Sequence, residues 1–144
     1  MLKGLQEGTK AFIERIKNNE GFRSTVYKDH LGFDTIGYGF AIKDMYMYEE
    51  VASLQLTMYL EEKYNHLDKN LDWFSDMPPE IQGVILEMVY QMGFSGFCKF
   101  KKAISNMKSK DWKGAATEML DSKWAKSDSP GRANRLADII REHG

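Results

Sequence analysis

Apolar residues recur every three or four positions over most of the chain, which is the spacing of a helix with one buried face. The pattern predicts a first helix over 5–17, ended by Asn18-Asn19, and a long second helix over 48–68. The clearest repeat predicts an amphipathic helix that starts at Pro78-Pro79 and stops at Gly93. Its apolar positions are Ile81, Val84, Ile85, Met88, Val89 and Met92. Shorter helices are predicted over 97–108, 111–121 and 130–142, the last with Ser129 as its cap.

One stretch departs from the helical spacing. Between Glu20 and Phe40, β-branched and aromatic residues alternate with glycines, which suits short strands and tight turns. We expect a small antiparallel sheet over about 24–43. Because strands are confined to this stretch, the order of elements predicts an α+β fold that is mostly helical.

Composition narrows the classes of function. The chain has 144 residues, with 20 Lys and Arg against 21 Asp and Glu, so there is no basic excess of the kind that nucleic-acid binding needs. Neither a secretory signal nor an apolar run of membrane-spanning length is visible. The sequence therefore predicts a protein made soluble in a cytoplasm, with no nucleic-acid partner and no stable membrane insertion.

The residues that usually bind metals or act as nucleophiles give no site. His30, His66 and His143 lie far apart and without metal-ligand spacing, so no metal and no cofactor is predicted. Cys98 is the single cysteine, so no disulfide can form within the chain, and a small buried apolar role is favoured over a nucleophilic one.

A run of lysines follows the predicted amphipathic helix and is opposed only by Asp111. Its members are Lys99, Lys101, Lys102, Lys108, Lys110 and Lys113. The simpler interpretation is a solvated helix face. The functional interpretation is a weak attraction to an anionic polymer such as peptidoglycan.

Two carboxylates and a hydroxyl offer catalytic chemistry. Glu20 lies at the end of the first helix beside Gly21, Asp29 precedes a glycine turn, and Thr35 lies in the next strand. Two carboxylates whose environments separate their pKa values can act as acid and base, as glycosidic bond hydrolysis requires. A hydroxyl such as that of Thr35 could hold the attacking water. Most carboxylates are surface solvators, so the pair alone is weak support for catalysis.

The spacing of these three residues resembles the motif of the phage-type lysozymes. That family has a glutamate, an aspartate nine residues later and, six residues further, a threonine in a T-I-G-x-G strand. The matching segments here are Glu20-Gly-Phe-Arg23, Tyr27-Lys-Asp29, Thr35-Ile-Gly-Tyr-Gly39, Met88-Val-Tyr-Gln-Met-Gly93, Ser122-Lys-Trp124 and Ser129-Pro-Gly-Arg132. They occur in family order and span residues 12 to about 141.

The resemblance implies a role for each matching residue. Glu20 would be the general acid, Asp29 would act as base or orient the water, and Thr35 would help to position that water. Arg132 would hydrogen-bond near Glu20. Two residues would line the sugar groove, namely Tyr90 and Gln91.

The resemblance also implies an organisation for the chain. A single lysozyme domain over 1–144 would hold a small β-containing lobe over 18–47, a connecting helix over 48–69 and a helical lobe over 70–144. The first helix would pack with the helical lobe.

The function so implied is an N-acetylmuramidase that cleaves the β-1,4 bond between N-acetylmuramic acid and N-acetylglucosamine and lyses bacterial cells for a phage. A water on the face opposite Glu20 predicts inversion at the anomeric carbon. The expected partners are peptidoglycan glycan strands, met by a monomer after holin-dependent release to the cell wall. Two alternatives remain open: a non-catalytic wall-binding or virion baseplate module of the same fold, and a lytic transglycosylase.

Overall fold

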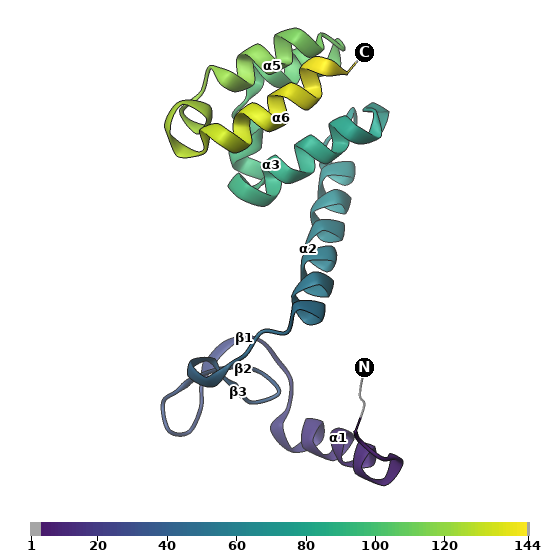
Figure 1. Cartoon of the computed structure of the whole chain (residues 1–144), viewed down its shortest axis with the longest axis vertical. Helices are drawn as coiled ribbons and strands as arrows, with labels where there is room; N and C mark the ends of the chain where they lie inside the picture. The colour runs from purple at the N-terminus through teal and green to yellow at the C-terminus, as the bar shows by residue number, and fades with distance from the viewer. Residues whose placement is uncertain (1–3, 144) are drawn as a thin grey trace. The chain divides into compact units, whose positions relative to one another are not determined.

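The computed structural model of the chain describes residues 4–143 and is mostly helical, with one small sheet (Figure 1). The elements in chain order are α1 (Glu7–Glu20), β1 (Arg23–Lys28), β2 (Asp34–Gly37), β3 (Phe40–Ala41), η1 (Ile42–Asp44), α2 (Glu49–Asn70), η2 (Phe74–Asp76), α3 (Pro79–Cys98), α4 (Lys101–Lys108), α5 (Trp112–Leu120), η3 (Trp124–Asp128) and α6 (Pro130–Glu142). This composition confirms the predicted α+β class. The chain divides into two compact units between Val51 and Ala52.

Helix α1 opens the first unit and runs further than the sequence predicted. It continues through Asn18-Asn19 and ends at Glu20, so the predicted end of this helix is wrong. The stop is set by Gly21, which has a φ of 71° and donates its N–H to the Lys17 carbonyl. A positive φ is costly for any residue with a Cβ, so the glycine and not the asparagines terminates the helix. Glu20 thereby occupies the last helical position.

The sheet of the first unit is a three-stranded antiparallel meander in the order β1-β2-β3. Thr35 lies opposite Tyr27 on one side and opposite Ala41 on the other, so it occupies the central strand. The predicted sheet over about 24–43 is confirmed. Of the described residues in this unit, only Thr35 and Gly37 are buried, and α1 buries none of its side chains.

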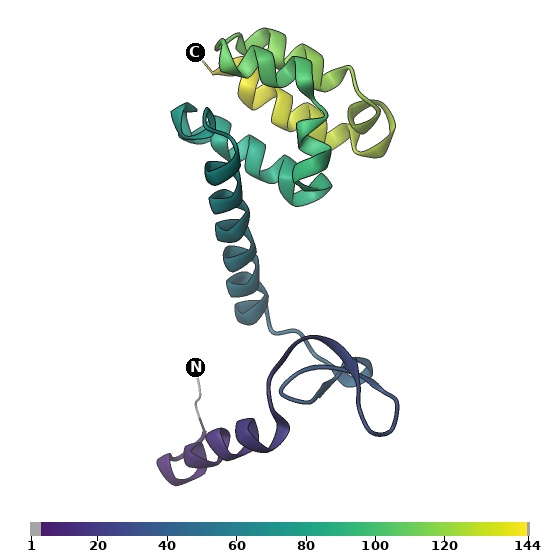
Figure 2. The ribbon, with the colours of Figure 1, turned by 180° about the vertical axis from the view of Figure 1, so that it is seen from behind.

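The second unit contains the hydrophobic core. Helices α3, α5 and α6 lie close together in both views of the ribbon (Figures 1 and 2). The predicted apolar face of α3 is buried at Ile81, Val84, Ile85, Met88 and Val89, and Met92 packs against the core as a half-buried side chain. Helix α2 contributes only Leu67 to the buried set. The core therefore forms among the elements that follow the long helix.

The ends of three helices differ from the sequence-based expectation. Gly93 has φ 81° and ψ 166° and kinks α3, but the helix resumes and ends at Cys98. A single glycine in this conformation interrupts the hydrogen-bond ladder without stopping the chain from returning to helical angles. The next helix accordingly begins at Lys101, not at 97. Ser129 occupies the N-cap position of α6, but its side chain makes no capping hydrogen bond. Asp111 does cap α5, since its carboxylate accepts from the Gly114 N–H at 3.0 Å.

None of the helices between residues 4 and 143 is long and apolar enough to cross a lipid bilayer.

Candidate active site

Glu20 is placed at the edge of the sheet by the end of α1 and by Gly39. The side chain of Glu20 lies against the backbone of Gly39, in the turn between β2 and β3. A Cβ at position 39 would stand 3.0 Å from Glu20 Cδ and 3.5 Å from its Cγ, and closer still to Oε2. Gly39 also has a φ of 77°, which a residue with a side chain rarely adopts. The second glycine of the T-I-G-Y-G segment therefore makes room for the Glu20 carboxylate.

Asp29 is held by the turn that joins β1 and β2. Its Oδ1 accepts two backbone N–H groups, from Leu31 and from Phe33, each at 2.9 Å. The Phe33 N–H, more than any other group, lowers the pKa of the Asp29 carboxyl below its ordinary value. Asp29 is therefore a half-buried carboxylate that stays ionised into acidic solution, and no group among residues 4–143 donates a hydrogen bond to its second oxygen.

Thr35 is attached to the same turn from inside the sheet. Its side chain is buried, with the whole residue only 3% exposed, and its Oγ1 donates to the Phe33 carbonyl at 2.9 Å. The backbone N–H of Asp29 donates to that carbonyl as well, also at 2.9 Å. The backbone of Phe33 thus ties Asp29 and Thr35 together. Because the hydroxyl proton is engaged, Thr35 can offer a water only its oxygen lone pairs.

The three predicted catalytic residues consequently come from α1, from the turn between β1 and β2, and from β2, all in one unit. Within residues 4–143, no hydrogen bond joins Glu20 directly to Asp29 or Thr35. Phe33 connects Asp29 to Thr35 through hydrogen bonds, and Gly39 makes room for the Glu20 carboxylate. Phe33 carries no signal in the sequence beyond its place after the glycine turn.

Two of the predicted substrate residues line one hollow of the second unit. Tyr90 of α3 and Arg132 of α6 border a space of about 310 Å³ together with Glu87. Its other lining residues are apolar or glycine, namely Leu56, Leu60, Gly83 and Leu86. Arg132 Nε donates to Glu87 Oε2 at 2.6 Å, a charge-assisted hydrogen bond between two helices. Glu87 belongs to none of the sequence motifs.

Gln91, the third predicted substrate residue, does not line that hollow. Its Oε1 accepts from the indole Nε1 of Trp124 at 3.0 Å. Adjacent helical residues point about 100° apart, so Tyr90 and Gln91 face different surroundings. Gln91 is positioned by the C-terminal tryptophan, and its place in a sugar groove stays a prediction.

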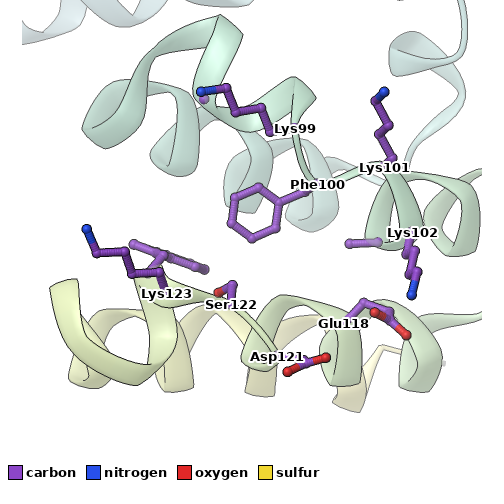
Figure 3. Close-up of a pocket in the computed structure, with 11 residues that line it drawn as sticks. Lys99, Phe100, Lys101, Lys102, Glu118, Asp121, Ser122 and Lys123 are labelled. Atoms are coloured by element: carbon purple, nitrogen blue, oxygen red, sulfur yellow. The ribbon is translucent and has the colours of Figure 1, made fainter.

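The lysine run does not form one face. Lys99, Lys101 and Lys102 border a pocket of about 470 Å³ together with Lys123, which lies beyond the run (Figure 3). Lys108 borders a separate hollow with Lys101, whereas two others border neither, namely Lys110 and Lys113. The predicted cluster is therefore split by the folding of α4.

The pocket of Figure 3 is also less basic than the sequence suggested. Glu118 and Asp121 from the end of α5 line it opposite the lysines, and Lys102 extends toward their side. Asp121 forms an ion pair with Lys126 at 2.6 Å, and this contact is the main cause of its lowered pKa. The ring of Phe100 meets that of Trp124 edge-on, with centroids 5.8 Å apart. The pocket thus combines the aromatic side chains of Phe100 and Trp124 with charged side chains of both signs.

Residues that could ligate metals stay dispersed. No group of three or more His, Cys, Asp and Glu side chains with metal-binding geometry occurs among the described residues. Cys98 is half-buried against the core, and burial raises the pKa of its thiol. A thiol that stays protonated is a poor nucleophile, which agrees with the apolar role predicted for it.

Comparison with known proteins agrees with the motif. The sequence model of the family described as phage lysozyme matches residues 17–139. The chain is 28% identical over 158 aligned positions to the pre-baseplate central spike protein Gp5 of Enterobacteria phage T4, covering 90% of this chain and 27% of that protein.

Two proteins of Dictyostelium discoideum are also similar. The probable T4-type lysozyme 2 is 32% identical over 90 positions, which cover 62% of this chain and 46% of that protein. The probable T4-type lysozyme 1 is 27% identical over 167 positions, which cover 88% of this chain and 91% of that protein. The chain thus spans about a quarter of the length of the spike protein and about half of the length of the probable T4-type lysozyme 2. Because the family model extends over most of the chain, from before Glu20 to beyond Arg132, this protein belongs to the phage lysozyme family.

Proposed function

We propose that this protein is an N-acetylmuramidase that hydrolyses the β-1,4 bond between N-acetylmuramic acid and N-acetylglucosamine. The observation that carries the proposal is the shared anchoring of Asp29 and Thr35 on the backbone of Phe33. It leaves an ionised carboxylate oxygen and a hydroxyl lone pair from neighbouring elements, and both groups are acceptors for the protons of one water. Membership of the phage lysozyme family and similarity to proteins named T4-type lysozymes support the same activity.

In the proposed reaction, Glu20 gives its proton to the glycosidic oxygen as the bond from that oxygen to the anomeric carbon breaks. A water donates one hydrogen bond to Asp29 Oδ2 and another to Thr35 Oγ1. As its oxygen bonds to the anomeric carbon, its proton passes to Asp29. Attack from the face opposite Glu20 inverts the anomeric configuration. The low pKa of Asp29 keeps it in the basic form for this step.

The second unit supplies the substrate contacts in this proposal. Tyr90 and Arg132 would bind the glycan, Gln91 would complete the groove, and Arg132 would also support Glu20. The resemblance further implies that α1 packs with the helical elements, and we include this in the proposal. The protein would act as a monomer on peptidoglycan strands, reaching the cell wall of a phage host after holin-dependent release.

A second candidate function follows from one similarity. The chain aligns over 90% of its length with a central spike protein of a phage baseplate. A virion-attached module of this fold, catalytic or only wall-binding, is therefore the alternative. An intact set of Glu20, Asp29 and Thr35 favours the catalytic form.

The test compares Glu20→Gln with a matched control on the same helix. Glu14→Gln also neutralises an exposed carboxylate of α1, which pairs only with Lys17. We expect Glu20→Gln to lower the rate of peptidoglycan lysis by about 10²–10⁴-fold, the usual contribution of a general acid. Glu14→Gln should lyse at the wild-type rate. Equal activity of all three proteins would reject Glu20 as the acid, and a wild-type protein that binds walls without lysing them would establish the binding module.

Product analysis separates the enzymatic alternatives. Hydrolysis gives reducing ends with a new hydroxyl, whereas a lytic transglycosylase gives anhydromuramic ends that are lighter by one water. Proton NMR during the first turnovers should show the α-anomer before mutarotation. If the β-anomer appears first, the reaction retains configuration and the role proposed for Asp29 is wrong.

A further inference from the structure

We propose that Glu87 is a positioning residue that orients the guanidinium of Arg132 for binding the glycan. This inference rests on the substrate role of Arg132 in the proposed function and extends it to a residue outside the motif. Its basis is the hydrogen bond of 2.6 Å from Arg132 Nε to Glu87 Oε2.

The hydrogen bond to Glu87 uses Nε of Arg132, which lies at the stem of the guanidinium and not at its outer end. A guanidinium carries five N–H donors, and a contact at Nε uses one of them. Within residues 4–143, the two terminal nitrogens of Arg132 make no hydrogen bond. Their four N–H groups keep the fork that binds a carboxylate or a pair of sugar oxygens. Glu87 therefore fixes the plane of the group without occupying its binding end.

The position of Arg132 in the first turn of α6 is a second reason for its pairing with Glu87. Arg132 is the third residue of this helix, whose first turn holds no acidic side chain. A cation at a helix N-terminus is repelled by the helix dipole, so an unpaired arginine here would turn away toward solvent. The carboxylate of Glu87, which comes from the middle of α3, compensates this repulsion and holds the side chain in place.

The residues that line the hollow restrict the geometry of the contact between Glu87 and Arg132. Among residues 4–143, Glu87 and Arg132 are the only charged side chains that line the hollow of 310 Å³, and Leu56, Leu86 and Tyr90 are among its other walls. The side chains of Glu87 and Arg132 are 43% and 30% exposed, respectively. The pair is therefore shielded enough to hold one geometry and open enough to meet a ligand. An exposed pair on α6, Asp138 with Arg141, lies outside this hollow and serves as a control.

The experiment measures kcat and KM on a soluble peptidoglycan oligomer for a set of variants. We expect Glu87→Ala to lower kcat by about 10- to 100-fold, since misplacement of a positioning group by about 1 Å has effects of this size. Glu87→Gln keeps an acceptor for Arg132 Nε and should recover most of the loss. Asp138→Asn should match the wild type in kcat and in thermal midpoint.

An exchanged pair separates positioning from simple stabilisation. Glu87→Arg combined with Arg132→Glu restores an ion pair between α3 and α6, so its thermal midpoint should return toward that of the wild type. Its kcat should stay as low as that of Arg132→Ala, because a carboxylate then occupies the binding position. Recovery of activity in the exchanged variant would show a purely structural pair and overturn the inference.

A readout that does not need turnover completes the test. The Nε–H proton of Arg132 should give a resolved NMR signal that exchanges slowly with water in the wild type and in Glu87→Gln, and vanishes in Glu87→Ala. A fast-exchanging signal in the wild type overturns the inference whatever the activity. If Arg132→Ala is fully active, the substrate role of Arg132 fails and this inference with it, whereas Glu20→Gln still decides the proposed function. If Arg132→Ala is impaired and Glu87→Ala is not, only the inference about Glu87 fails.

Discussion

The carboxylate of Glu20 lies against the backbone of Gly39, at a distance that leaves no space for a side chain on the glycine. This contact joins the end of α1 to the turn between β2 and β3. It explains why a glycine stands at the end of the T-I-G-Y-G segment, since the positive φ disfavours other residues and a side chain there would displace the Glu20 carboxylate.

Gly39→Ala should therefore impair catalysis by displacing Glu20. We expect kcat for peptidoglycan hydrolysis to fall by about 10²-fold, the effect of moving a catalytic group by about 1 Å. Gly93→Ala is the matched control, because Gly93 also has a positive φ but a Cβ there would meet nothing within 4 Å. Both variants should lose some stability from backbone strain. If the two lose activity equally, strain and not the contact with Glu20 is responsible.

The hydrogen bonds to Asp29 predict how stability depends on pH. Its pKa is lowered in the folded protein, chiefly by the Phe33 N–H, whereas the unfolded chain has the ordinary value of about 3.9. The carboxylate therefore stabilises the fold above that value, and the contribution disappears as pH falls through the folded pKa. The unfolding free energy of the wild type minus that of Asp29→Asn should shrink as the pH falls below the ordinary carboxyl pKa of about 4. Urea titrations across this range measure it, and a difference that stays constant with pH would contradict the prediction.

The pocket of Figure 3 predicts where charge affects wall binding. Replacing Lys99, Lys101 and Lys102 with Glu should raise the apparent KM on cell walls at low salt and leave kcat on a short neutral chito-oligosaccharide nearly unchanged. The effect should fade at physiological salt, where exposed charges are screened beyond about 8 Å.

The control for this prediction carries the same change in charge outside the pocket. It replaces Lys108, Lys110 and Lys113 with Glu, none of which lines the pocket of Figure 3. If both triple variants bind walls equally, only net charge matters. If both match the wild type at every ionic strength, the lysines form a solvated face.

The apolar face of α1 gives a test of the proposed packing of this helix. Ile16 is 55% exposed and no side chain of α1 is buried. If the helix packs with the helical elements in solution, Ile16→Ser should lower the unfolding free energy by about 1.5–3 kcal/mol. Leu31→Ser, in an exposed turn of the same unit, should change it by less than about 0.5 kcal/mol. Equal small losses in denaturant titrations would show that α1 stays uncovered.

Much of the fold could be predicted from the sequence because its signals are local. The apolar repeat of α3 follows from helical periodicity, and the glycines between Glu20 and Phe40 mark the stretch that holds the strands of the described residues. The spacing of Glu20, Asp29 and Thr35 identified the candidate catalytic set. Where one residue's conformation decides, the sequence misplaces the boundary. The sequence places the end of the first helix at Asn18-Asn19, although Gly21 ends it, and it places the end of another helix at Gly93, although that helix resumes and ends at Cys98.

Contacts between residues distant in sequence were decided only by the tertiary structure. Nothing in the sequence showed that Glu87 would meet Arg132 45 positions later, or that Trp124 would engage Gln91. The lysine run likewise looked continuous, yet the packing of α4 beside α5 divided it and brought Glu118 and Asp121 to its pocket. Periodicity fixes which face of a helix is apolar, but the partner of a polar side chain depends on how helices pack, and this is settled by the core as a whole.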